Sequence, residues 1–222
     1  MYTKLIAVPD LSTRLEVEAQ RFYSEIKAKR VLKCAYMSDK DRRLMAYTDF
    51  GIGLTSPLPQ LNSFLEHLNT NIGELSNKIM LDAGHYLGVA TAFFSKKFRQ
   101  VISVEGDSLV AAEARELVKR LAEKDLAELD RIEWKNANYL SVEVPFQGID
   151  ILYNYYDHAG VPEKETIFLH NLSAKFINEA PCGALLVILN SDLCRKKIHM
   201  LRHSPALSYR IGKYNFNVFQ KD

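Results

Sequence analysis

The sequence predicts an α/β protein with a doubly wound, mostly parallel seven-stranded sheet, an antiparallel C-terminal strand and an N-terminal helical appendage. Three observations predict it. From residue 78 onward, short apolar segments alternate with amphipathic helical segments, which implies a parallel sheet. Residues 184–190 (ALLVILN) are almost wholly apolar, as in a strand buried on both faces. Residues 209–210 and 214–220 alternate around Gly212 like an antiparallel pair.

Composition supports a globular domain and excludes several classes. The chain has 222 residues, 47% hydrophobic and 25% charged, with a net charge of +2. We therefore expect neither a nucleic-acid nor a membrane partner on overall charge. No apolar run reaches the ~18 residues of a membrane span. Cys34, Cys182 and Cys194 lack paired spacing, which argues against disulfides or a zinc cluster and favours a cytoplasmic protein.

The first 50 residues are expected to form the helical appendage, and residues 51–222 the α/β domain. Thr13 and Glu16 have capping-box spacing, and helical periodicity continues to about Leu32. A polar break at 38–43 and a Gly/Pro-rich loop at 49–59 follow. Pro57 and Pro59 fit the start of a helix that reaches about residue 69.

Five strands and three helices are predicted in the rest of the chain before the C-terminal pair. The strands are expected at 78–82, 101–105, 131–135, 149–153 and 184–190, and the helices at 88–98, 108–127 and 163–178. Doubly wound sheets bind ligands at the carboxyl ends of their strands, where the strand order reverses. Functional side chains are therefore sought just after each strand.

The segment from residue 78 to 105 carries the most informative motif. Its first strand ends at Asp82, and a turn with Gly84 and Gly88 leads into a helix. Glycine permits unusual backbone angles and lets a ligand approach the main chain. Glu105 ends the next strand, where an acid can accept hydrogen bonds from a ribose diol.

The motif is not the dinucleotide fingerprint G-x-G-x-x-G. Tyr86 stands at the second glycine and Val89 at the third. Tyr86 obstructs the close approach that a diphosphate needs, which disfavours an NAD-dependent oxidoreductase. An acid before the first glycine instead suits a ligand without phosphate, because it can act on an ammonium group directly or through water.

The segment resembles motif I of the class I, seven-strand S-adenosylmethionine-dependent methyltransferases, an acid followed by x-G-x-G-x-G. Tyr86 replaces the middle glycine, as in the catechol-type O-methyltransferases. The resemblance extends from about residue 55 to the C-terminus. It implies S-adenosyl-L-methionine as cofactor, with Asp82, Gly84, Tyr86 and Gly88 forming its turn and Glu105 binding the ribose hydroxyls.

Further matches imply the remaining site residues. Asn138 falls where the superfamily usually has an aspartate that contacts the adenine amino group. Thr55 lies in a segment (LTSP) that resembles the loop touching the methionine carboxylate in the non-SET lysine methyltransferases. Their N-x-aromatic active-site segment is similar to the stretch from which the catalytic candidates come: Asn154, Tyr155, Tyr156 and Asp157.

Several of these residues also have a purely structural explanation. Asp82 can cap the following helix, the two glycines can form a plain turn, and Glu105 can be a solvated acid. Tyr155 and Tyr156 can pack beneath the helix that follows them. His85 is not expected to be a general base, and the basic stretch at 195–203 is expected to be a solvated face.

The predicted function is methyl transfer to a nitrogen of a protein lysine or another amine. The acceptor and the oligomeric state are not specified further by the sequence. No metal site is expected, since Asp150 and Asp157 are the only acids near the fourth strand. Two alternatives stay open: a small-molecule O-methyltransferase, suggested by Tyr86, and a catalytically silent binding module, suggested by Tyr86 and Asn138.

Overall fold

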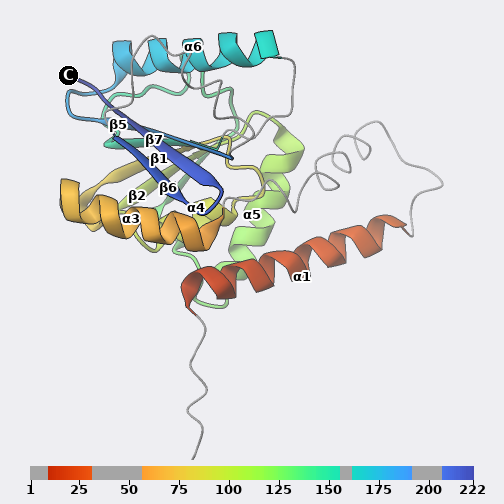
Figure 1. Ribbon diagram of the computed structural model, residues 1–222. Coiled ribbons are helices and arrows are strands. Elements are labelled where there is room, and N and C mark those ends of the chain that lie inside the picture. Colours follow the sequence, from red (N-terminus) through yellow and green to blue (C-terminus); the bar gives the residue numbers. More distant parts are fainter. Residues whose placement is uncertain (1–9, 32–56, 156–161, 192–206) are drawn as a thin grey trace, which may run out of the picture.

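The computed structural model describes residues 10–31, 57–155, 162–191 and 207–222. A seven-stranded sheet has the order β3-β2-β1-β4-β5-β7-β6. Figure 1 shows helix α6 on one face of the sheet and α3, α4 and α5 on the other. The strands are β1 (Ile79–Ala83), β2 (Gln100–Val104), β3 (Ile132–Lys135), β4 (Ile151–Tyr155), β5 (Leu185–Ser191), β6 (Leu207–Ile211) and β7 (Tyr214–Gln220).

The sheet confirms the predicted fold class. Strands β1 to β5 pair in parallel, whereas β7 is antiparallel to both β5 and β6. The chain builds outward from β1 through β2 to β3, then returns to place β4 on the other side of β1. This reversal brings the carboxyl ends of β1, β2 and β4 to one edge, the place where such sheets bind ligands.

The helices of the described chain are α1 (Leu11–Val31), α3 (Leu58–Ile72), α4 (Val89–Ser95), α5 (Ser108–Ala122) and α6 (Pro162–Glu179), with 3-10 turns η3 (Leu75–Asn77) and η4 (Leu129–Arg131). Helix α5 ends five residues earlier than predicted. Asp125 has a φ of 56°, a left-handed conformation that does not continue a helix. No helix in the described ranges combines the length and the apolar character needed to cross a bilayer.

Two apolar layers hold the sheet between its helices. Beneath α1, α3, α4 and α5, the ring of Phe64 stacks on that of Phe216 at 4.4 Å, and Phe94 meets Tyr153 edge to face at 5.0 Å. Beneath α6, Leu172 and Phe176 pack against the opposite face. Successive side chains along each strand point alternately into the two layers, which explains why the central strands are apolar throughout.

Helix α1 is part of the main core. Its Leu15, Ala19 and Phe22 are buried in the same cluster as α3, α4 and α5. The capping prediction was wrong: Asp10, not Thr13, caps the helix, since the Thr13 amide donates to Asp10 Oδ1 at 2.8 Å. The first half of helix α1 therefore packs against the α/β domain.

Candidate functional site

The turn after β1 spans residues 84–88 and is tied to the end of β2. Gly84, Tyr86 and Gly88 have φ values of 78°, 57° and 77°, so all three are left-handed. The amides of Gly84 and His85 donate to the carbonyl of Val104 at 2.9 and 3.1 Å. The Gly88 amide donates to the His85 carbonyl at 2.9 Å. The motif thus forms one hydrogen-bonded unit at the edge where β1 and β2 end.

The two glycines serve different physical needs. A Cβ on Gly88 would lie 2.9 Å from the Val118 side chain and 3.3 Å from that of Ala114, so Gly88 allows the turn to approach α5. A Cβ on Gly84 would meet only the ring of Tyr139 at 3.7 Å and the amide of Asn154 at 4.0 Å. These are ordinary van der Waals distances, so the left-handed φ of 78°, rather than tight packing, is what favours glycine at position 84.

Glu105 lies directly after β2 and is bonded to the turn. One carboxylate oxygen accepts the Tyr86 amide at 3.3 Å, and the other accepts the Asp107 amide at 3.0 Å. Burial raises the pKa of the Glu105 carboxyl above its usual range. The Gly106 amide also favours the ionised carboxylate. Glu105 is thus held by the surrounding backbone at the sheet edge, where a carboxylate can accept hydrogen bonds from a ligand diol.

Asp82 is buried beneath α4 rather than displayed at the sheet edge. Its Oδ2 accepts the hydroxyl of Thr91 at 2.6 Å, and Thr91 contacts the hydroxyl of Ser103 at 2.8 Å. Burial, opposed by the Thr91 hydrogen bond and assisted by the nearby Glu105 charge, raises the pKa of Asp82 to about 7. Asp82 thus links β1 to α4 through Thr91, but it does not cap the helix, whose N-cap is Gly88. The hydroxyls of Thr91 and Ser103 were not singled out by sequence.

Asn154 lies inside β4, one residue from its end, and not after the strand as predicted. Its Nδ2 donates to the carbonyl of Ala83 at 2.8 Å, which fixes the amide orientation. Its Oδ1 is buried and has no hydrogen-bond partner among the described residues. Tyr155 is half-buried and packs on the opposite face, because neighbouring strand residues alternate.

The remaining residues considered from the sequence are Asn138, the acid Asp150 and three residues outside the described ranges. Asn138 is exposed after β3, and its Oδ1 accepts the Leu140 amide at 2.9 Å, an arrangement that leaves one lone pair. Asp150 lies at the opposite end of β4, where it accepts the Ile79 amide at 2.7 Å. Three predicted residues lie outside the described ranges: Thr55, Tyr156 and Asp157.

The structure therefore brings Gly84, Tyr86, Glu105 and Asn154 to one edge of the sheet. Tyr139, which sequence reasoning missed, joins them because its ring faces Gly84. Its position one residue after Asn138 was the available signal. In the described ranges, no group of three His, Cys, Asp or Glu side chains is arranged to hold a metal.

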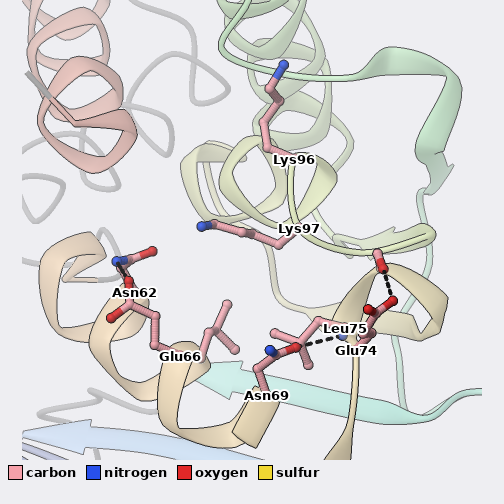
Figure 2. Close-up of a pocket in the computed structure, with 9 residues that line it drawn as sticks. Asn62, Glu66, Asn69, Glu74, Leu75, Lys96 and Lys97 are labelled. Atoms are coloured by element: carbon pink, nitrogen blue, oxygen red, sulfur yellow. Dashed lines mark hydrogen bonds between the residues drawn. The ribbon is translucent and has the colours of Figure 1, made fainter. Parts of the chain in front are cut away.

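A separate pocket of about 330 Å³ lies at the other edge of the sheet (Figure 2). It is bounded by α3, η3 and the residues after α4, which precede the starts of β1 and β2. Lys96 at its rim is already paired with Asp125 and Glu128, at 2.8 and 2.6 Å. This pocket is therefore not the predicted cofactor site, which lies at the carboxyl ends of the strands.

Comparison with solved structures shows the class of fold. The chain is similar to an RNA methyltransferase from Salinibacter ruber in complex with S-adenosyl-L-homocysteine, with a TM-score of 0.53 and 12% identity over 71% of this chain and 90% of that one. It is also similar to an rRNA methylase from Streptococcus thermophilus (TM-score 0.51, 14%, 76% and 99%) and to TrmN from Thermus thermophilus (TM-score 0.55, 16%, 71% and 48%).

No protein-family model matches the chain, and no curated protein matches it significantly. The strand order, the glycine turn and these structural likenesses together define the class I S-adenosylmethionine-dependent methyltransferase fold. The chain has this fold. The narrower resemblance to the non-SET lysine methyltransferases stays a prediction from the segments around Thr55 and Asn154.

Proposed function

We propose that the protein is an S-adenosylmethionine-dependent methyltransferase that acts on a nitrogen, of a protein lysine or another amine. The observation that carries this proposal is the buried, unpartnered Oδ1 of Asn154 beside the Gly84 turn. Buried polar atoms are nearly always hydrogen-bonded in folded proteins, and an exception indicates a missing partner. A donor from the ligand or acceptor would supply it.

The residues at the sheet edge fit the cofactor. Gly84 carries no Cβ, so a ligand can approach the backbone of the turn, and the Glu105 carboxylate beside it is placed to accept hydrogen bonds from the ribose hydroxyls. The Oδ1 of Asn138 keeps one lone pair for the adenine amino group. When bound, S-adenosylmethionine supplies a methyl group on an activated sulfonium, so the protein needs only to orient and desolvate the acceptor.

Asn154 suits an amine acceptor better than a hydroxyl. Its Oδ1 accepts one N–H of a neutral amine and leaves the nitrogen lone pair free to attack. An alcohol must instead lose a proton to a base as it attacks. Of the described bases near the turn, Asp82 accepts the Thr91 hydroxyl, His85 Nδ1 contacts the Tyr86 carbonyl at 2.8 Å, and Glu105 is assigned to the ribose in this proposal. The small-molecule O-methyltransferase is therefore the weaker alternative.

The acceptor class needs a direct test, because several structural neighbours are named as RNA methylases. At 12–16% identity this likeness concerns the fold, and it does not select an acceptor. The purified protein would be incubated with methyl-labelled S-adenosylmethionine and a lysine-rich peptide library, total RNA or a catechol. Label in peptide supports the proposal, whereas label in RNA alone or catechol alone overturns the lysine acceptor.

Asn154→Ala provides the matching variant. We expect methyl transfer to fall at least about 100-fold, while S-adenosylhomocysteine affinity changes less than about threefold, because the amide orients the acceptor and not the cofactor. Asn217→Ala is the control, since Asn217 also donates from a strand to a backbone carbonyl, that of Ile188. Equal losses in both variants would remove Asn154 from the site. Failure of the wild type to bind S-adenosylhomocysteine would favour the silent binding module.

A further inference from the structure

Tyr86 has a backbone conformation that a tyrosine rarely adopts. Its φ of 57° lies in the left-handed region, where the Cβ of a non-glycine residue crowds the following carbonyl. The motif that the turn resembles has glycine here, which adopts this conformation freely. Something in the structure must therefore hold the turn in place of the missing glycine.

We propose that His85 is a positioning residue that holds the Tyr86 peptide and so maintains the cofactor turn without the middle glycine. The part of this inference that concerns the cofactor rests on the proposed function. The part that concerns the turn stands on contacts within the protein.

The two peptide groups that flank Tyr86 are both held by side chains. On one side, the Tyr86 amide donates to Glu105 Oε2 at 3.3 Å. On the other side, the Tyr86 carbonyl lies 2.8 Å from His85 Nδ1. Because φ and ψ of a residue are the rotations between its two flanking peptides, fixing both peptides fixes the conformation of Tyr86.

The hydrogen bond to the carbonyl requires a proton on Nδ1, and the surroundings keep the ring neutral. His85 is only 4% exposed, and burial together with the Arg115 charge lowers its pKa to about 4. A neutral imidazole carries its single proton on one nitrogen, so the donor to Tyr86 defines the Nδ1–H tautomer. His85 Nδ1 is thus a fixed donor to the Tyr86 carbonyl.

The orientation of the His85 ring is set by neighbouring elements. The ring meets Trp134 of β3 edge to face, with centroids 5.3 Å apart and planes at 82°. The guanidinium of Arg115, from α5, lies 5.9 Å from the Trp134 ring on a cation–π contact. Among the described residues, the charged or titratable groups near the turn include Arg115 from α5, Glu105 after β2 and Asp82 in β1. Trp134 of β3 and Arg115 of α5 therefore help to orient the His85 ring, which holds the turn.

This arrangement makes the position of Glu105, the acid proposed to bind the ribose, depend on His85. Glu105 bonds the Tyr86 amide, so a turn that relaxes from the left-handed conformation removes one of the bonds that hold the carboxylate. We expect loss of the His85 donor to weaken cofactor binding even though His85 does not touch the cofactor. If residue 86 is glycine, the turn needs no such support, and the same loss should have little effect.

A double-mutant cycle measured by calorimetric titration with S-adenosylhomocysteine tests this coupling. His85→Phe keeps the aromatic contact with Trp134 but removes the donor, and should weaken binding about 10-fold, the effect of one lost hydrogen bond. His85→Asn places an amide N–H near the Nδ1 position and should restore affinity to within about threefold. With Tyr86→Gly present, His85→Phe should weaken binding less than about twofold.

An equal loss in the tyrosine and glycine backgrounds would overturn the proposal, as would a His85→Asn protein as weak as His85→Phe. A second measurement needs neither variant nor cofactor. Nitrogen-15 NMR of the wild-type imidazole should show His85 as the Nδ1–H tautomer, neutral down to about pH 5. An Nε2–H tautomer would refute the role of His85. Absence of S-adenosylhomocysteine binding with the Nδ1–H tautomer present would instead refute the proposed function alone.

Discussion

Glu105→Gln tests the cofactor assignment most directly. The Glu105 carboxylate accepts the backbone amides of Tyr86 and Asp107, and in the proposed function it also accepts the ribose hydroxyls. Glutamine has nearly the same shape but has one carbonyl oxygen and an NH₂ group in place of the two oxygens. It therefore cannot accept from both amides and both hydroxyls.

The expected loss follows from the hydrogen bonds involved. A hydrogen bond to a charged group contributes about 1.5–3 kcal/mol, and about 1.4 kcal/mol corresponds to a tenfold change in Kd. We therefore expect Glu105→Gln to weaken S-adenosylhomocysteine binding by about 10- to 150-fold. Burial raises the pKa of Glu105, so the titration belongs at pH 8, where the carboxyl is ionised.

The assay is calorimetric titration of folded wild-type and variant protein with S-adenosylhomocysteine, with NAD as the negative ligand. Glu133→Gln serves as the matched control, because Glu133 lies on the neighbouring strand β3, is exposed and contacts only nearby side chains. Its affinity should stay within about twofold of wild type. Unchanged affinity in a folded Glu105→Gln protein would refute the assignment of Glu105 to the ribose.

Three further predictions concern stability, each measured by urea unfolding. Because the pKa of Asp82 rises to about 7 on folding, the native state holds its proton longer and loses stability between about pH 4 and 7. The free energy of unfolding of Asp82→Asn relative to wild type should therefore rise by about 1.4 kcal/mol per pH unit over this range. A difference between the two proteins that does not change with pH would contradict this. Gly88→Ala should lower the free energy of unfolding by about 2–4 kcal/mol, because the new Cβ would contact Val118. Gly183→Ala should lower it by only about 1 kcal/mol, because Gly183 has the same left-handed conformation but no neighbour within 4 Å. Equal losses would disprove the packing role of Gly88. Phe22→Ala should lower the free energy of unfolding by about 3 kcal/mol, because Phe22 is buried in the core, and a loss below about 1 kcal/mol would show that α1 adds little to the stability of the domain.

The fold followed from the sequence because its signals are local. Apolar strands and amphipathic helices alternate visibly, and Gly212 separates the final antiparallel pair, as the structure confirms. The errors lie at element ends. The helix cap moved from Thr13 to Asp10, and β4 starts at Ile151 because Asp150 is held by the Ile79 amide from a neighbouring segment. That contact joins residues far apart in the chain, so no local pattern reports it.

The candidate site divides in the same way. By itself, the sequence determined the α/β class and the glycine turn with the acid of the next strand, from Gly84 to Glu105, because their spacing along the chain is fixed by covalent connection. Only the tertiary structure decided what those residues contact. It buried Asp82 beneath Thr91, left the Oδ1 of Asn154 without a described partner, and set His85 against Trp134. Each of these outcomes depends on side chains from separate strands and helices that meet only when the sheet assembles, and burial is a property of that assembly.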